Sequence, residues 1–242
     1  MKAELAKSIK DKFGYGGELT ELDTVYVPIK PTVTTEECEE VFREMTEEVF
    51  SLYGDLFLKE KLTLMVHVGF PDGKTNLYPS KGVPVEAVVE PNPEWTGAAM
   101  TAPNTLKLKS GTLKKIHIDY TKFGTEYDFY YFVPHEHKKY DQWLKNKLSQ
   151  DGFTLQHEWY FTFTPPGARM GKHCDVLGPN LRYSFAVRQP VTDRSITIDD
   201  VHYYIPENTA YILDGRTPHE IIQDADSPRL MLLGALTVGS LD

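Results

Sequence analysis

The spacing of apolar residues in the N-terminal part of the chain predicts helices. In TTEECEEVFREMTEEVFSLYGDLF, apolar residues recur at intervals of three and four, which is the period of an amphipathic helix. Thr34 or Thr35 stands before this run and is a suitable N-cap. We therefore expect residues 1–61 to be mostly helical.

The pattern changes to that of strands in the next part, residues 62–154. KLTLMVHV, TLKLKSGTLKKIHIDY and YDFYYFV alternate or run apolar over strand lengths, and turn sequences such as PDGK and PNPEW separate them. HEHKKYDQWLKNKLSQDG then has the spacing of one amphipathic helix, with a glycine after its end. We expect these strands and this helix to support the barrel or sandwich formed by the residues that follow.

Short strands in close succession fill the last part, residues 155–242. They are LQHEWYFTFT, LRYSFAVRQ, SITIDDVHYYI, TAYILD, HEIIQ and RLMLLGALTV, with turn sequences between them. This arrangement is typical of a barrel or sandwich, here with helices packed outside. No linker or repeat divides the chain, so we expect 1–242 to form a single domain.

Composition narrows the class of partner. Hydrophobic residues make up 40% of the 242 residues, enough for a large core, while the net charge of −9 argues against a nucleic acid or an anionic membrane as partner. Two cysteines, Cys38 and Cys174, form no disulfide framework. The N-terminus is charged and has no apolar stretch of a signal peptide, so we expect a cytoplasmic protein. The oligomeric state stays open.

Candidate chemistry lies in RMGKHCDVLGPNLRYSF. His173 and Asp175 are two residues apart, so in an extended segment both side chains point to the same side. Such a pair forms either a metal site or a buried ion pair. His219 follows the turn DGRTP, and Arg229 opens the last apolar strand, where a charged side chain needs an anionic partner. Two histidines and one carboxylate are the ligands of non-haem Fe(II) sites, and also of some Zn sites.

The run PPGARMGKHCD…R…LDGRTPHE…R resembles the double-stranded β-helix oxygenases that use Fe(II) and 2-oxoglutarate. Within them it is most similar to the aspartyl/asparaginyl β-hydroxylase-like branch, which includes free-proline hydroxylases. The likeness covers Trp159 to Val238. It implies a mainly β fold with flanking helices, built on a jelly-roll, cupin-like barrel.

The resemblance also implies roles for individual residues. His173, Asp175 and His219 would hold the iron, and Arg229 would bind the distal carboxylate of 2-oxoglutarate. Arg182 would meet a carboxylate of either the co-substrate or the substrate. The remaining candidates are Thr162, as a hydroxyl beside Arg229, and, for the substrate, Arg188, Arg169 and the lid residue Trp95.

The implied reaction consumes O2 and 2-oxoglutarate, releases succinate and CO2, and hydroxylates an unactivated C–H of an amino acid, free or in a peptide. The carboxylate at Asp175 favours hydroxylation over halogenation, which needs that position vacant. One alternative is a 2-oxoglutarate oxygenase that hydroxylates or desaturates a small natural product. Another is a metal-binding cupin that oxidises nothing.

A second H-x-D pair, His117 and Asp119, competes for the role of metal ligands, with His157 and Arg169 as its distal partners. It lacks the Pro-Gly turn, and no turn precedes its second histidine. We interpret it as a pair on the face of a sheet.

Overall fold

The computed structural model describes residues 3–13, 25–69, 98–120, 123–148, 153–175, 181–191, 195–215 and 217–238. The helices are α1 (Ala3–Phe13), α3 (Thr35–Glu60) and α4 (His137–Leu148). The strands are β1 (Tyr26–Ile29), β2 (Thr63–Gly69), β3 (Ala98–Lys107), β4 (Gly111–Tyr120), β5 (Thr125–Pro134), β6 (Phe153–Thr164), β7 (Arg169–His173), β8 (Leu181–Arg188), β9 (Ile196–Ile198), β10 (Val201–Tyr203), β11 (Ala210–Asp214), β12 (His219–Ile222) and β13 (Arg229–Val238).

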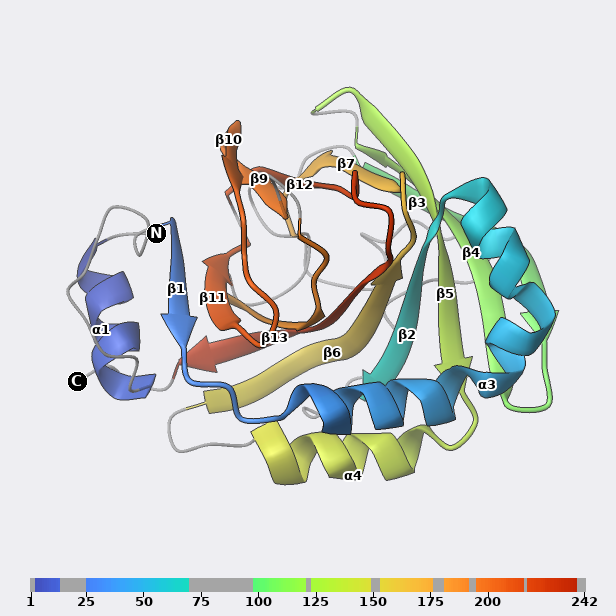
Figure 1. Ribbon diagram of the computed structural model, residues 1–242, viewed down its shortest axis with the longest axis horizontal. Helices are drawn as coiled ribbons and strands as arrows, with labels where there is room; N and C mark the ends of the chain where they lie inside the picture. The colour runs from blue at the N-terminus through green and yellow to red at the C-terminus, as the bar shows by residue number, and fades with distance from the viewer. Residues whose placement is uncertain are drawn as a thin grey trace.

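Strands β6 to β13 form a double-stranded β-helix. The larger sheet contains the order β11-β8-β13-β6, and the smaller sheet has the order β10-β9-β12-β7. All of these neighbours are antiparallel, and the two sheets face each other around a common interior (Figure 1). The chain thus winds between two sheets as in a jelly roll. The predicted fold class is confirmed by this strand order.

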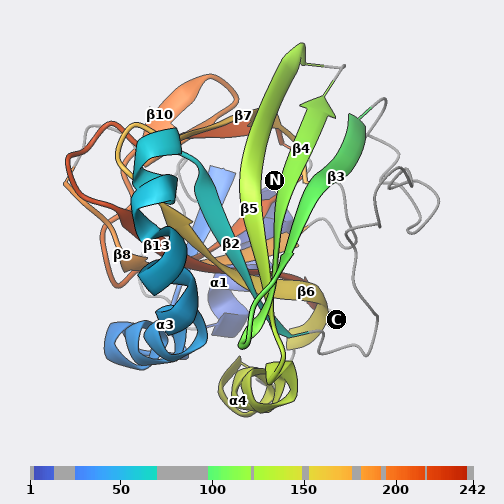
Figure 2. The ribbon, with the colours of Figure 1, turned by 90° about the vertical axis from the view of Figure 1, so that its right-hand side faces the viewer.

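The N-terminal half of the chain extends the larger sheet at both edges. β1 pairs with β11, and β2 pairs with β6 at the opposite edge. Beyond β2 the sheet continues through β5, β4 and β3, which stand beside the barrel (Figure 2). The first 61 residues were expected to be mostly helical, and among those that the structure describes the strand β1 departs from this expectation. A four-residue strand is too short for its period to be recognised.

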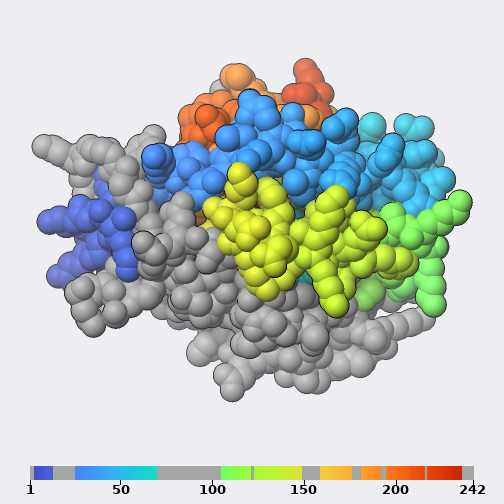
Figure 3. Space-filling model, turned by 90° about the horizontal axis from the view of Figure 1, so that it is seen from below, coloured from blue at the N-terminus to red at the C-terminus, as the bar shows by residue number. Residues whose placement is uncertain are grey.

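Helices α3 and α4 lie side by side over the outer face of the larger sheet (Figures 1 and 3). Strand β13 shows how the sheet serves two cores. Leu230 and Leu232 pack outward with the helices, whereas Met231 and Leu233 belong to the barrel interior. This alternation follows from the two-residue period of a strand, and it separates the structural core from the space available for a site.

Local signals explain where α3 begins and ends. Thr34 and Glu37 form a reciprocal capping box, with hydrogen bonds of 3.2 Å in both directions. The helix ends at Lys61, whose backbone is in the left-handed region at φ 54°. Leu52, which its spacing assigned to the buried face, is 58% exposed.

The segment SITIDDVHYYI, expected as one strand, is a hairpin of β9 and β10. Asp199 and Asp200 both have positive φ, 50° and 66°, between the paired residues Ile198 and Val201. Two such residues in succession form the tight turn that suits the twist of a hairpin, and aspartate tolerates this conformation. None of the described helices combines the length and the apolar character needed to cross a bilayer.

Candidate metal centre

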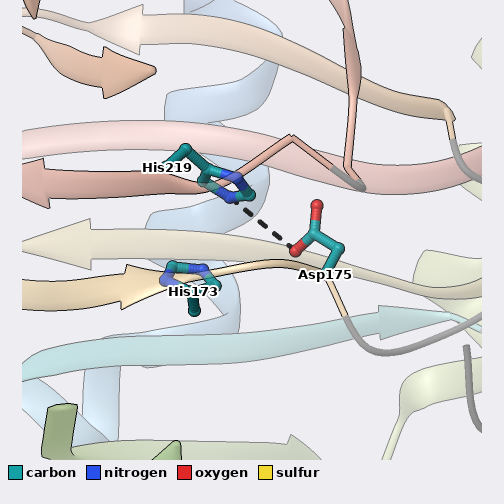
Figure 4. A group of neighbouring side chains, drawn as sticks. All are labelled: His173, Asp175 and His219. Atoms are coloured by element: carbon teal, nitrogen blue, oxygen red, sulfur yellow. Dashed lines mark ion pairs between the residues drawn. The ribbon is translucent and has the colours of Figure 1, made fainter. Parts of the chain in front are cut away.

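Two histidines face each other across the smaller sheet. His173 ends β7 and His219 begins β12, and the two residues are direct partners in the antiparallel ladder. Their ring centroids are 4.4 Å apart, and both side chains are buried. Figure 4 shows the two rings on neighbouring strands beside the carboxylate of Asp175.

Backbone hydrogen bonds orient both imidazoles in the same way. Nδ1 of His173 lies 2.7 Å from the carbonyl oxygen of Gly171, and Nδ1 of His219 lies 2.9 Å from that of Thr217. A carbonyl oxygen can only accept, so each Nδ1 donates, and each Nε2 is the ring nitrogen that could bind a metal. Metal-binding histidines typically donate a hydrogen bond from the other ring nitrogen to a backbone carbonyl or a carboxylate in this way.

Asp175 completes the group. Its backbone N–H donates to the carbonyl oxygen of Gly215 at 2.7 Å, and its Oδ1 lies 3.9 Å from Nε2 of His219. One ligand atom from each of His173, Asp175 and His219 lies within 4.8 Å of the others. Within the described ranges, no other group of three or more histidine, cysteine or acidic residues meets this geometry. The structure thus brings together the three residues expected to bind the metal.

The protonation states at this site suit a divalent cation. Burial, together with the neighbouring His219, lowers the pKa of His173 to about 4, so its ring is neutral at neutral pH. Burial alone would raise the pKa of Asp175. The charge of Arg182 and the neighbouring histidines have the opposite, larger combined effect, so the pKa of Asp175 is lowered. Neutral imidazoles and an ionised carboxylate are the forms in which these side chains bind Fe(II) or Zn(II).

Arg182 lies beside the candidate ligands. It was expected to receive a carboxylate of the co-substrate or the substrate, but the carboxylate it meets belongs to the chain. Its Nε lies 2.9 Å from Oδ2 of Asp175, and both side chains are largely buried, at 11% and 18% exposed.

Arg229 brings a second buried guanidinium into the barrel. One Nη donates to the carbonyl oxygen of Ser195 at 2.8 Å, and the hydroxyl of Tyr211 forms a hydrogen bond with the same side chain. Its Nε is buried and has no hydrogen-bond partner among the described residues. Burial lowers the pKa of Arg229, and among the described residues no carboxylate lies within ion-pair distance of it. The site therefore favours an anionic ligand at this point.

A cavity connects Arg229 with the three candidate ligands. Ser195, which accepts a hydrogen bond from Arg229, lies just before β9. Ile198, at the far end of β9, pairs with His219. About three residues of strand, roughly 10 Å, therefore separate the Arg229 end of the cavity from the candidate ligands. Hydroxyl groups line the space on the larger sheet and apolar side chains complete it. The lining residues are Tyr160, Thr162, Thr164, Met170, His173, Asp175, Arg182, Ser184, Ile196, Tyr211, Leu213, His219, Ile221, Arg229, Met231 and Leu233.

Thr162, expected as a hydroxyl beside Arg229, is buried and lines this cavity, but it pairs with Met231 in the ladder. The residue opposite Arg229 is Thr164. Sequence reasoning also missed Tyr211, although the alternation in TAYILD would have placed Tyr211 and Leu213 on one face. The contact of Tyr211 with Arg229 depends on the order of strands in the larger sheet, where β8 lies between β11 and β13, so no local pattern reveals it.

A hairpin from outside the barrel supports the site. The rings of Tyr120 on β4 and Tyr127 on β5 lie 5.6 and 5.8 Å from that of His173. Thr125, where β5 begins, donates its hydroxyl to the carbonyl oxygen of Lys172 at 2.8 Å. Phe129, within YDFYYFV, is buried in the core. Through Tyr127, however, the same strand also touches a candidate ligand.

Two of the candidate substrate residues lie away from the cavity. A register shift between Leu230 and Met231 makes Ala186 the partner of Met231 and Arg188 the partner of Leu230, leaving Val187 as an extra residue. Arg188 therefore turns to the outer face, where its Nη2 lies 2.5 Å from Glu39. Arg169, the first residue of β7, is exposed. Trp95 lies outside the described residues.

The competing H-x-D pair has a different partner. Nδ1 of His117 lies 2.8 Å from Oδ1 of Asp128 on the neighbouring strand β5, so the histidine belongs to a cross-strand ion pair. Asp119 lies on the same strand as His117, and the side chain of His157 is outside what the structure describes.

Comparison with known proteins supports the sequence resemblance. Residues 140–237 match the family model of aspartyl/asparaginyl beta-hydroxylase. No curated protein matches the chain. Among solved structures, a 2OG-Fe(II) oxygenase-family oxidoreductase from Burkholderia pseudomallei is similar at 8% identity and a TM-score of 0.34, over 58% of this chain and 84% of that one. A prolyl-4-hydroxylase from Pseudomonas putida is similar at 17% identity and a TM-score of 0.29, over 57% and 78%.

TM-scores of this size do not establish a common fold, so the fold rests on the strand order described above. The family match is independent of these scores and spans β7 to β12 entirely. Residues 140–237, which contain the three candidate ligands and both cavity arginines, are thus similar to the aspartyl/asparaginyl beta-hydroxylase family.

Proposed function

We propose that the protein is an Fe(II)- and 2-oxoglutarate-dependent dioxygenase. In this proposal it hydroxylates an unactivated C–H bond of an amino acid, free or within a peptide. The family match supports a hydroxylase, and the donor set of two imidazoles and one carboxylate fits Fe(II).

One observation carries the choice of a dicarboxylic co-substrate. The cavity that holds the three candidate ligands also contains Arg229, a buried cation with no carboxylate of the described chain beside it. A hydrolytic zinc site has no need of such a cation. A keto acid that chelates the metal with one end and carries a second carboxylate at the other end would neutralise it.

In this proposal, different residues of the cavity would bind the metal and the keto acid. His173, Asp175 and His219 would hold the metal on one side and leave its other positions open toward the cavity. Arg229 and Tyr211 would bind the far carboxylate of the keto acid, and the apolar walls would exclude water. When bound, Fe(II) with the keto acid and O2 would supply the oxidising power for hydroxylation, with release of succinate and CO2.

An anaerobic titration of the purified protein with Fe(II) and 2-oxoglutarate tests this proposal. A keto acid chelated to Fe(II) gives a visible charge-transfer band, which we expect in the wild type and not in His219→Ala. His202→Ala is a matched control, because His202 lies on the same sheet but hydrogen-bonds to Thr197 outside the ligand group. The control should give the wild-type band.

Absence of the band in a metal-loaded wild type would contradict the keto-acid role and favour a metal-binding cupin that oxidises nothing. If the band appears, succinate release in the presence of free amino acids, and then of peptides, tests the substrate class. Turnover only with small natural products would contradict the amino-acid assignment and leave the co-substrate assignment intact.

A further inference from the structure

The two oxygen atoms of the Asp175 carboxylate have different surroundings. Oδ1 is turned toward Nε2 of His219, at 3.9 Å, on the side where the metal ligands converge. Oδ2 lies 2.9 Å from Nε of Arg182. A charge-assisted contact of this length holds the second oxygen away from the other ligand atoms.

Arg182 reaches Asp175 from the opposite sheet. It lies within β8, between Leu213 on β11 and Ala235 on β13, so its backbone is held by strands on both sides. Asp175 follows β7 of the smaller sheet. The ion pair therefore spans the barrel interior and ties the ligand-bearing loop to a strand of the larger sheet that is paired on both sides.

Gly215 closes the third side of the carboxylate. Its carbonyl oxygen accepts the backbone N–H of Asp175 at 2.7 Å. A Cβ atom at position 215 would lie 2.7 Å from Oδ2 and 2.9 Å from Cβ of Asp175, closer than real Cβ contacts occur. Gly215 also begins the short segment that leads to His219, so one loop holds one ligand and carries another.

We propose that Arg182 and Gly215 form a positioning frame, a pair of residues that orients Asp175 as a ligand through one oxygen. Arg182 then acts on the metal through Asp175, and is committed to that carboxylate instead of receiving one from the co-substrate or the substrate. The identity of the metal as iron rests on the function proposed above, but the frame itself concerns any divalent cation at this site.

The proposal has a consequence for substrate recognition. Among the described residues that line the cavity, Arg182 and Arg229 are the two arginines, and no lysine joins them. With Arg182 held by Asp175 and Arg229 assigned to the keto acid, neither is available for a substrate carboxylate. The described cavity walls would instead recognise substrate through hydroxyls and apolar contacts.

Metal affinity in the absence of any keto acid is the direct test. Co(II), a spectroscopic substitute for Fe(II), is titrated into the full-length apo protein, and binding is followed by its visible absorption. Loss of a residue that orients a ligand typically weakens metal binding 10- to 100-fold. We expect a weakening of about that size in Arg182→Met and in Gly215→Ala, and a smaller one in Arg182→Lys, which retains the charge.

Arg188→Met is the matched control, since it removes an arginine from the same strand that pairs outside the cavity with Glu39. It should bind Co(II) like the wild type. A double-mutant comparison adds a second criterion. If Arg182 acts through Asp175, then Arg182→Met should cost little further affinity in an Asp175→Ala background.

Wild-type Co(II) affinity in folded Arg182→Met and Gly215→Ala proteins would overturn the proposal. So would an Arg182→Met protein that binds Co(II) normally but needs more 2-oxoglutarate to form the iron band, because Arg182 would then be a carboxylate receptor. Should Arg182→Met fail to fold, Gly215→Ala and Arg182→Lys decide the question. A missing keto-acid band in the wild type refutes the proposed function but leaves the Co(II) result valid.

Discussion

At the scale of single residues, Arg229 shows most clearly how burial produces a binding site. Arg229 is 2% exposed, and within the described ranges its guanidinium hydrogen-bonds with the carbonyl of Ser195 and the hydroxyl of Tyr211. A buried charge without an opposite charge lowers the free energy of unfolding. An anion that binds to it in the folded protein raises that free energy again.

Replacement of Arg229 with Met tests this interpretation. Loss of one partner of a buried, hydrogen-bonded charge pair costs about 2–5 kcal/mol, so the concentration of 2-oxoglutarate needed to form the iron band should rise at least about 30-fold. Co(II) affinity without keto acid should stay at the wild-type value. An unchanged 2-oxoglutarate requirement would show that the distal carboxylate binds elsewhere.

Tyr211→Phe should have a smaller effect of the same kind. The hydroxyl contributes one hydrogen bond beside Arg229, and a single bond of this type is worth about 0.5–1.5 kcal/mol. We therefore expect about a threefold to tenfold rise in the 2-oxoglutarate requirement, measured by the same titration. A fall in Co(II) affinity would instead show that the tyrosine supports the metal ligands.

At the scale of elements, the pairing of β13 with β6 depends on one close approach. Gly234 lies opposite Trp159, and a Cβ atom there would lie 1.9 Å from the indole ring. The indole is 1% exposed, packs on Tyr183 and donates its N–H to the carbonyl oxygen of Ala235 at 3.0 Å. The ring therefore has no room to move aside.

We predict that Gly234→Ala lowers the free energy of unfolding by about 1–3 kcal/mol or more, as overpacking of a core does. Urea denaturation measures it. Gly54→Ala is the matched control, because Gly54 lies within α3 and a Cβ there would make only an ordinary contact of 3.4 Å with Phe50. Alanine should stabilise that helix by about 0.5–1 kcal/mol. Equal effects at both positions would contradict the packing argument.

At the scale of the whole molecule, the barrel shares its core with the N-terminal half. Phe42 and Phe50 on α3 pack against Phe163 on β6, and Lys147 of α4 pairs with Glu37 of α3 at 2.5 Å. β1 and β2 supply the two neighbouring strands of the barrel's larger sheet. The family-matched segment alone would expose this apolar face and two unpaired strand edges.

We therefore predict that residues 140–238 do not fold in isolation, whereas the full chain unfolds in a single cooperative transition. Thermal unfolding followed by near-ultraviolet and far-ultraviolet circular dichroism measures this, and the two signals should coincide for the full chain. Two separate transitions, or a soluble and folded isolated segment, would show that the barrel is a domain of its own and would contradict the single-domain expectation.

Local patterns were sufficient for most of the elements and for part of the site. The period of three and four in α3, the Thr34 cap and the succession of short C-terminal strands each depend on nearby residues, so a single sequence contains them. The two-residue spacing of His173 and Asp175 likewise places both on one side of an extended chain, whatever surrounds them.

Only the tertiary structure decided which side chain each arginine contacts. Counting by twos along β8 puts Arg182 and Arg188 on one face, but the extra residue Val187 turns Arg188 outward to Glu39. Arg182 meets Asp175 because two facing sheets bring them together, whereas Tyr211 on β11 reaches Arg229 on β13 through the strand order of the larger sheet. The direction of a side chain follows from its own strand. Which side chains contact each other depends on the register and order of the strands and on the facing sheet, and local spacing in the sequence does not determine these.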